Sequence, residues 1–267
     1  MAWADNREVN LNAPTLLPAD RAIFDLELLQ LLRGPRLCRA LRTLAVIGAH
    51  RFDESRLIDR IFPGLERLYV FEPLAEPLEH LHALAARDPR VRVFPVALDE
   101  TDGTATFHVS SNAGESSSLL PFGTHSEHFP EVQMTRTIEV PTRRLDTLLA
   151  EQGLPAPDAL LIDVQGAEYR VLASLPPGLL KSVRLIYTEV SLESIYQGAR
   201  PLSDVEQLLA PRFVNMGFAP LNPQVGVHGN AVFAASDDVA ALLDISLRER
   251  LRRVHRRWRE RRRERQR

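Results

Sequence analysis

The sequence predicts an α/β fold in which helices cover both faces of a mostly parallel sheet. From residue 43 onward, short apolar runs alternate with segments whose apolar residues recur every three or four positions, which is typical of strands and helices taking turns. The runs are apolar at consecutive positions, as expected for strands that are covered on both faces. The composition, 45% hydrophobic and 25% charged residues, is that of a globular protein and excludes a disordered or fibrous chain.

Cysteine content and charge distribution indicate the compartment. Cys38 is the only cysteine, so an intramolecular disulfide and a cysteine-rich metal site are excluded and a reducing compartment is expected. Charged residues precede the first apolar run, which is the wrong order for a signal peptide. The longest uncharged run, 214–236, contains prolines and glycines that a membrane-spanning helix would not tolerate. We therefore expect a cytoplasmic protein without integral membrane association.

Residues 1–40 are expected to form an N-terminal helical extension, because isoleucine and leucine recur every three residues between 19 and 32. The main domain, 41–236, then begins with strands and helices in alternation. The first helix starts after Asp53, and the second carries leucines at 78, 81 and 84. The first three strands are expected at 44–47, 68–71 and 91–96.

The middle of the chain interrupts this alternation with a loop rich in serine, glycine and histidine, 110–131, which is long enough to be a lid or a binding loop. Farther along, Ser203 and Glu206 form a capping box that opens a helix, and Gly217 ends the helical pattern. The predicted sheet has six or seven strands and closes with an antiparallel pair. Two strands expected at 105–109 and 135–141 bracket the 110–131 loop. The remaining strands of the sheet are expected at 160–164, 183–190, 218–221 and 230–234, with helices from 145 and at 167–174.

Residues 237–267 are expected to form a basic helix. Apolar residues recur at spacings of three or four from 243 to 258, and 248–267 hold twelve arginines against three glutamates. The preceding residues hold 21 basic and 32 acidic side chains, a balance of −11. We interpret the tail first as a helix that docks on this acidic body or forms a homodimer. Contact with an anionic surface, a membrane or a nucleic acid, is the second interpretation.

Ligands of an open parallel sheet bind beyond the carboxyl ends of its strands, so the residues that follow each strand are the candidates for a site. Gly48-Ala49-His50 follows the first strand, where a residue without a side chain lets the backbone approach a ligand. Glu72 follows the second strand, 24 residues beyond Gly48. A carboxylate at that place suits the 2′ and 3′ hydroxyls of an adenosine ribose, although a plain strand exit explains it as well.

Two further acids interrupt apolar strands. Asp163 ends one predicted strand, and Glu189 lies near the end of the next. A carboxylate in such a setting must be paired or must line a cleft, because burying an unpaired charge is costly. Glu168 has a simpler explanation, since acids are favoured at helix N-termini. We therefore expect Asp163 and Glu189 to belong to the site.

These residues stand in an order that resembles the FkbM family of S-adenosylmethionine-dependent methyltransferases. The resemblance covers about residues 43–234, and it implies a Rossmann-like class I methyltransferase sheet with S-adenosylmethionine as the cofactor. It depends on the following segments taken together: Gly48-Ala49, Phe71-Glu72-Pro73, Val96-Ala97-Leu98, Asp102-Gly103, Ser116 to Leu120, Leu145-Asp146, Asp163 to Glu168, Glu189, Gly217-Phe218, Asn230 and Phe233.

The resemblance implies a role for each candidate residue. Glu72 would bind the cofactor ribose, the Gly48-Ala49-His50 turn would lie along its methionine part, and Ala97-Leu98 would border the adenine. Asp163 would face the methionine ammonium or the acceptor. Since the cofactor carries its own activated methyl group, the protein mainly has to position it. No metal is expected, because the sequence has neither His-x-x-x-His nor clustered histidine and cysteine.

The implied reaction is methyl transfer to a hydroxyl oxygen on a sugar or another small metabolite, with a small-molecule or glycan acceptor selected by the 110–131 loop. A general base would take the hydroxyl proton as the new bond forms. Asp163 is the first candidate for this base and Glu189 the second. His50 and His228 are the others.

The chain departs from the family pattern at the first turn, where Val46, His50 and Phe52 replace an aspartate, an asparagine and a glycine. Leu161 and Gln165 likewise replace a lysine and an acid. The alternative is therefore a non-catalytic binding or scaffold protein with a degenerate cofactor site. The Phe52 side chain is expected to project where backbone would normally approach the ligand. A Phe52 ring that fills the hollow in front of the second-strand acid would indicate this alternative. A nicotinamide-dependent oxidoreductase is disfavoured, because the turn lacks the Gly-x-Gly-x-x-Gly spacing.

Overall fold

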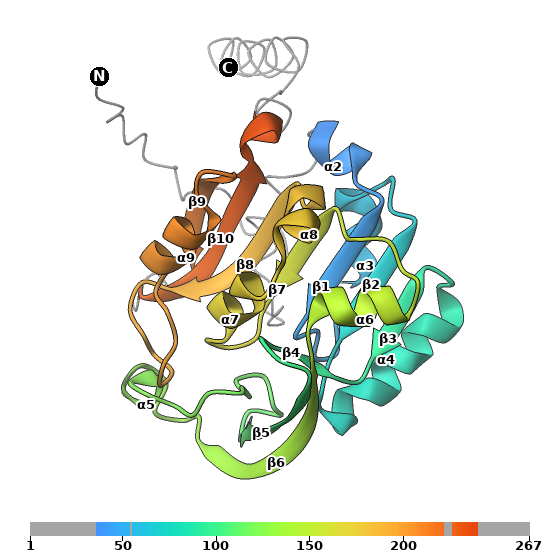
Figure 1. Cartoon of the computed structure of the whole chain (residues 1–267). Coiled ribbons are helices and arrows are strands. Elements are labelled where there is room, and N and C mark those ends of the chain that lie inside the picture. The colour runs from blue at the N-terminus through green and yellow to red at the C-terminus, as the bar shows by residue number, and fades with distance from the viewer. Residues whose placement is uncertain (1–35, 54, 222–225, 240–267) are drawn as a thin grey trace, which may run out of the picture.

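The computed structural model describes residues 36–53, 55–221 and 226–239, which form a seven-stranded sheet covered by helices and a smaller three-stranded sheet (Figure 1). The strand order in the large sheet is β3-β2-β1-β7-β8-β10-β9. Its strands are parallel except for β10, which pairs antiparallel with both β8 and β9. The predicted α/β fold, with its antiparallel terminal pair, is confirmed.

The strands and helices lie close to their predicted ranges. The large sheet consists of β1 (Thr43–Ile47), β2 (Arg67–Phe71), β3 (Val91–Phe94), β7 (Ala159–Ile162), β8 (Leu185–Ser191), β9 (Phe213–Pro220) and β10 (His228–Ala235), and the small sheet of β4 (Ala97–Leu98), β5 (Gly103–Ser110) and β6 (Met134–Arg143). The helices are α2 (Arg36–Ala40), α3 (Ser55–Ile61), α4 (Ala75–Arg87), α5 (His125–His128), α6 (Leu145–Glu151), α7 (Glu168–Ala173), α8 (Pro177–Ser182) and α9 (Leu202–Leu209), with a 3₁₀ turn at Ser236–Asp238.

The two faces of the large sheet bury separate cores, because side chains alternate along a strand. On β1, Leu44 and Val46 face a cluster formed with α2, α3 and α4, whereas Ala45 and Ile47 face α6, α7, α8 and α9. The second of these layers lies in front of the sheet in Figure 1. A helical layer on each face explains why the strands are apolar at consecutive positions.

The small sheet, in the order β4-β6-β5, lies beyond the carboxyl ends of the large sheet's strands (Figure 1). The sequence predicts the two longer strands but not β4, since two residues are too few to show a periodicity. After β5 the chain turns back, so that Ser118 bridges to His108. The first part of the 110–131 loop is thereby held beside β5, near the strand ends where a ligand would bind.

The turn after β1 uses residues in the left-handed backbone conformation. Gly48, His50 and Phe52 have φ values of +77°, +45° and +50°. A Cβ atom on Gly48 would lie 1.7 Å from the backbone oxygen of Asp163, so only glycine fits there. The N–H groups of Gly48 and of the next residue both donate to the Phe71 carbonyl oxygen, which ties the turn to β2. His50 and Phe52 stand where the family pattern has an asparagine and a glycine. They keep the left-handed backbone conformation that asparagine and glycine adopt readily.

Some predicted details are wrong. The capping box does not form, because α9 directly follows Pro201 and no side chain caps it, which leaves Ser203 and Glu206 inside the helix. The fixed φ of proline already suits the start of a helix. Gly217 lies within β9 and does not end a helix. The third strand ends at 94 rather than at 96.

The helix expected at 19–32 and most of the basic helix expected at 237–267 lie outside the described residues. The division into 1–40, 41–236 and 237–267 therefore stays a prediction. Within the described ranges, no helix combines the length and the apolar character that a membrane crossing requires.

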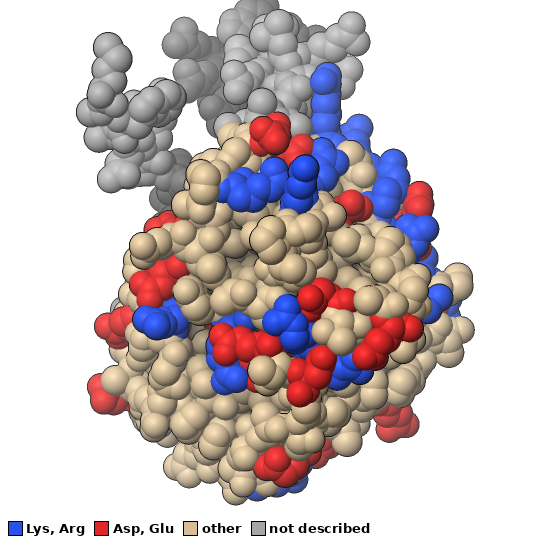
Figure 2. All heavy atoms as spheres, viewed as in Figure 1, with Lys and Arg blue, Asp and Glu red and all other residues tan. Residues whose placement is uncertain are grey.

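Charged side chains on the face shown in Figure 2 are intermixed by sign over its centre. Arg144 pairs with Asp146 at 3.1 Å, and Arg170 pairs with Asp99 at 2.5 Å. The Arg144–Asp146 pair is partly exposed and contributes little to stability. The acidic excess of the main domain therefore does not form a single acidic patch on this face.

The left-handed backbone at Phe52 gives a stability prediction. Phe52→Ala should lower the free energy of unfolding by about 3–5 kcal/mol, because the side chain is fully buried. Phe52→Gly should be at least as stable as Phe52→Ala, since glycine avoids a left-handed strain of roughly 1–2 kcal/mol. Urea unfolding of both variants measures the difference.

Phe62 provides the matched control for this comparison, because it is buried in the same core but is not in the left-handed region. At position 62 the glycine variant should be less stable than the alanine variant by about 0.5–1 kcal/mol. If the glycine variant were less stable than the alanine variant by the same free energy at positions 52 and 62, the strain argument would be contradicted.

Candidate functional site

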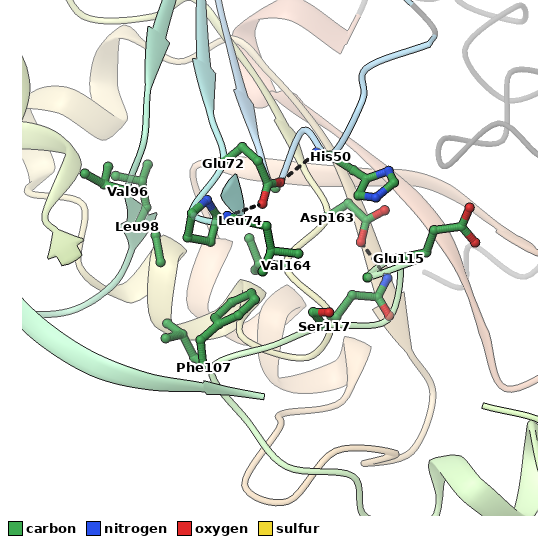
Figure 3. Close-up of a pocket in the computed structure, with 16 residues that line it drawn as sticks. His50, Glu72, Leu74, Val96, Leu98, Phe107, Glu115, Ser117, Asp163 and Val164 are labelled. Carbon is green, nitrogen blue, oxygen red and sulfur yellow. Dashed lines mark hydrogen bonds between the residues drawn. The ribbon is translucent and has the colours of Figure 1, made fainter. Parts of the chain in front are cut away.

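A cavity of about 540 Å³, including its open mouth, lies beyond the carboxyl ends of β1, β2 and β7 (Figure 3). Ala49 is buried and does not line the cavity; the N–H of this residue donates to the end of β2. The sequence-predicted residues that do line it are Gly48, His50, Glu72, Ala97, Leu98 and Asp163.

Glu72 lies at the end of β2, and backbone groups hold its carboxylate. The His50 N–H donates to Glu72 Oε2 at 2.7 Å, and the Leu74 N–H donates to Oε1 at 2.8 Å (Figure 3). Each oxygen keeps a further lone pair that can accept a hydrogen bond. Burial raises the pKa of Glu72 to about 7, although the two backbone N–H groups lower it. The carboxylate is therefore oriented before any ligand arrives.

The loop at 111–118 forms a wall of the cavity and is attached to several elements. The His50 ring nitrogen Nε2 lies 3.0 Å from the Ala113 carbonyl oxygen, which can only accept. Ser118 donates from Oγ to the Val164 carbonyl oxygen at 3.3 Å. The Tyr196 hydroxyl oxygen lies 3.2 Å from a backbone oxygen of the loop. These contacts place Gly114, Glu115, Ser117 and Leu119 on the cavity wall. Farther along the 110–131 loop, Leu120 and Phe122 pack in a separate apolar cluster.

Apolar side chains line the opposite part of the cavity. Val96, Leu98 and Phe107 lie on one side of it, Asp163 lies on the other, and Glu72 lies between them (Figure 3). The cavity is therefore apolar at one end and acidic at the other. This arrangement can accommodate a flat apolar group, a hydroxylated group and a cation in that order.

Buried carboxyl groups gather at the acidic end. The Gln165 amide nitrogen donates to Asp163 Oδ1 at 2.7 Å and also to Glu189 Oε2. Asp163 Oδ2 is buried and has no hydrogen-bond partner within the described part of the chain. Glu168 is satisfied differently, because backbone N–H groups of the turn after β7 donate to it at 3.1 Å. No group of His, Cys, Asp and Glu among the described residues could hold a metal ion.

Burial dominates the electrostatics of these acids. Burial, followed by the neighbouring Glu189, raises the pKa of Asp163 well above its ordinary value. Burial also raises the pKa of Glu189 to about 8 and that of Glu168 to about 7. Gln165 donates to both carboxyls, and Asp163 and Glu189 each act on the pKa of the other. The two therefore titrate as a pair, and such perturbed acids are typical of functional sites.

The two candidate histidines lie in different surroundings. The His50 ring contacts the loop at 111–118, as described above. His228 does not line the cavity, and its Nε2 atom lies 3.2 Å from Glu189 Oε2. Its Nδ1 atom lies 2.8 Å from Ser191 Oγ. Burial lowers the pKa of His228, which favours the neutral ring.

The replacements in the first turn leave the cavity open. Phe52 is fully buried in the core beside α3, and its ring does not line the cavity. Val46 faces the same core. The expectation that the Phe52 side chain projects toward a ligand is wrong, because the side chain packs beneath the turn. The Phe52 ring therefore does not fill the hollow in front of Glu72, which was the observation that would have indicated a non-catalytic binding protein.

Sequence reasoning missed two residues that the fold brings to the site. Phe107 occupies one position of an alternating strand, and nothing in that pattern singles it out. Tyr196 lies in a connection without periodicity, yet its hydroxyl donates to Gln165 Oε1 at 2.6 Å. In the sequence, Gln165 stands out only because it differs from the family pattern. In the structure, its amide nitrogen donates to both Asp163 and Glu189.

Structural comparison matches this chain to two solved structures at low sequence identity. An FkbM methyltransferase from Methylobacillus flagellatus is 13% identical with a TM-score of 0.49, covering 77% of this chain and 50% of that chain, so this chain spans half its length. Fibrillarin from Aeropyrum pernix, solved with S-adenosyl-L-methionine natively bound, is 11% identical with a TM-score of 0.45, covering 78% and 74%.

Sequence comparison gives a more specific result. The 2-O-methyltransferase NoeI from Sinorhizobium fredii is 32% identical over 169 residues, which cover 61% of this chain and 69% of NoeI. Residues 47–219 match the family model for the methyltransferase FkbM domain. This match covers more than half of the chain and includes both walls of the cavity that carry Glu72 and Asp163. The chain therefore belongs to the FkbM methyltransferase family.

Proposed function

We propose that this chain transfers a methyl group from S-adenosylmethionine to a hydroxyl oxygen of a sugar or another small metabolite. The observation that carries the proposal is the cavity, in which Glu72 lies between an apolar wall and a buried acid pair. Glu72 matches the ribose of the cofactor, the apolar wall matches the adenine, and the acid pair matches the cationic methionine part. When bound, the cofactor supplies an activated methyl group on a positively charged sulfur.

The residues of the cavity fit this cofactor. Glu72 would accept hydrogen bonds from the ribose hydroxyls with the lone pairs that the backbone leaves free. Ala97-Leu98 and Phe107 would border the adenine, and the Gly48-Ala49-His50 turn would lie along the methionine. A cation at the acidic end favours ionisation of the buried acids, because an opposite charge lowers the pKa of a carboxyl.

The Asp163 and Glu189 carboxyls would act together as the general base. When the pair has lost one proton, it carries one negative charge and one shared proton. As the C–O bond forms, the acceptor hydroxyl loses its proton to Asp163 Oδ2, which is the oxygen without a partner, and the pair becomes neutral. Gln165 holds both carboxyls in place for this transfer.

A hydroxylated acceptor is supported by the chemistry of the cavity wall. Glu115 and Ser117 are polar residues of the loop at 111–118 that line the cavity. Such side chains bind hydroxyl groups by hydrogen bonds, as a sugar acceptor requires. NoeI, which shares 32% identity, is named as a methyltransferase acting on an oxygen.

The proposal also includes the cellular setting expected from the sequence. This setting is cytoplasmic, with a small-molecule or glycan acceptor. The basic tail, 237–267, would dock on the body or join two copies, with an anionic surface as the second candidate. These statements stay predictions.

Removing the Glu72 carboxylate tests the donor site. Glu72→Ala is expected to weaken binding of S-adenosylmethionine about 100-fold, because hydrogen bonds to a charged group contribute about 1.5–3 kcal/mol. Binding of S-adenosylhomocysteine should weaken equally, since both ligands contain the same ribose. Calorimetric titration measures both affinities.

Glu76→Ala is the control for this measurement. Glu76 is an exposed glutamate on α4 that pairs with Arg136, and its removal should leave both affinities unchanged. Equal affinities in Glu72→Ala and the unaltered protein would contradict the assigned ribose contact. No binding to the unaltered protein at millimolar ligand would instead support the non-catalytic alternative.

Neutralising the acid pair tests the general base. Asp163→Asn and Glu189→Gln should each lower the rate of methyl transfer by about 10²–10⁴-fold. The affinity for S-adenosylmethionine should change far less in Glu189→Gln, because Glu189 does not line the cavity. Formation of S-adenosylhomocysteine with a panel of sugars and glycans measures the rate, and Asp102→Asn, at an exposed acid, serves as the control. A loss of affinity without a loss of rate in saturating cofactor would contradict the assigned role.

The pKa values of the acid pair predict the pH dependence of the reaction. The base must be ionised, and the raised pKa of about 8 for Glu189 means that this state is lost as the pH falls through that value. The rate should therefore rise with pH and level off above about pH 8. The kcat/KM for S-adenosylmethionine reports the pKa values of the free enzyme, so a kcat/KM that is flat between pH 6 and 9 would be inconsistent with this base.

A further inference from the structure

Glu189 has a second buried neighbour, His228, that the reaction steps above do not use. In the antiparallel pairing of β8 with β10, Glu189 lies opposite Asn230, and Ser191 lies opposite His228. Directly opposite residues share a face of the sheet, and side chains alternate along each strand. The register therefore places all four side chains on one face, with His228 diagonally across from Glu189.

The distances define how the imidazole is used. His228 Nε2 lies 3.2 Å from Glu189 Oε2, and Nδ1 lies 2.8 Å from Ser191 Oγ. An ionised carboxylate can only accept a hydrogen bond, so Nε2 must carry the hydrogen when Glu189 is charged. A neutral imidazole then has its lone pair on Nδ1, and the Ser191 hydroxyl donates to it. One tautomer satisfies both contacts.

We propose that His228 is a positioning residue that donates from Nε2 to Glu189 and thereby holds the negative charge of the acid pair in place. Ser191 selects the tautomer that makes this donation. The inference rests on the proposed function, because the charge on the pair is what takes the acceptor proton. No proton leaves His228 in this step.

The charged groups around His228 are compatible with a neutral donor. Glu189 faces it from β8, Asp163 and Glu168 act on it from the turn after β7, and His125 lies on α5. Burial lowers the pKa of His228 more than Asp163 and Glu168 raise it. Burial also lowers the pKa of His125 to about 4, so that ring adds no positive charge at neutral pH.

Replacing His228 should move the pH profile of the reaction. His228→Leu removes the donor, so the pH of half-maximal rate should rise by about one unit, which is roughly a tenfold loss of rate at lower pH. The KM for S-adenosylmethionine should stay within about twofold, because His228 does not line the cavity. His228→Gln supplies an amide N–H and should return the profile toward that of the unaltered protein. Ser191→Ala should give a smaller shift in the same direction.

His128→Leu is the matched control. His128 Nε2 also lies 3.0 Å from a glutamate oxygen, but its partner, Glu193, is 56% exposed and away from the acid pair. This variant should leave the pH profile unchanged. An equal shift in His128→Leu and His228→Leu would overturn the proposal, as would a His228→Gln profile that matches His228→Leu.

Nuclear magnetic resonance tests the inference without cofactor or acceptor. The ¹⁵N shifts of the His228 ring at a pH where Glu189 is ionised should show a protonated Nε2 and an unprotonated Nδ1. The ¹³C carboxyl titration of Glu189 should move to higher pH in His228→Leu and back in His228→Gln. A doubly protonated ring or the opposite tautomer would overturn the proposal. These spectra need no methyl transfer, so they test the role of His228 alone. Failure of the proposed function would be recognised separately, because the protein would then not bind S-adenosylmethionine.

Discussion

The close approach of two backbone turns determines the geometry of the site. Gly48 lies so near the Asp163 carbonyl oxygen that even one methyl group would overlap it. The same turn donates two N–H groups to the Phe71 carbonyl oxygen and a third, from His50, to the Glu72 carboxylate. The ends of β1, β2 and β7 are therefore fixed relative to one another. This is why Glu72 and Asp163, which are far apart in the sequence, face one cavity.

The buried acids are stabilised in two ways, and the difference separates structural roles from chemical ones. Backbone N–H groups satisfy Glu72 and Glu168, as is common for carboxylates at turns and helix N-termini. Asp163 and Glu189 instead share one side-chain amide, that of Gln165. An unsatisfied buried acceptor costs about 1–3 kcal/mol, so the unpartnered Asp163 Oδ2 is retained at a cost that a substrate contact would offset.

Much of the fold and part of the site follow from local sequence patterns. Alternating apolar runs predict the parallel sheet, and an acid inside such a run predicts that Asp163 and Glu189 need partners. The partners themselves are not predictable, because Tyr196 and Gln165 meet only through tertiary contacts. The Phe52 error has a similar origin. A sequence shows which side chain occupies a turn, but the backbone dihedral angle decides toward which side it points.

Gln165 and Leu161 explain how the site retains its acids despite departing from the family pattern. Where the pattern has a lysine and an acid, this chain has two neutral residues, so one positive and one negative charge are lost together. Leu161 packs in the apolar core, where an unpaired ammonium would be costly. An acid at 165 would bring another carboxylate against Asp163 and Glu189, whereas the amide donates to both. The two replacements therefore compensate each other electrostatically, and they argue for a modified site rather than a degenerate one.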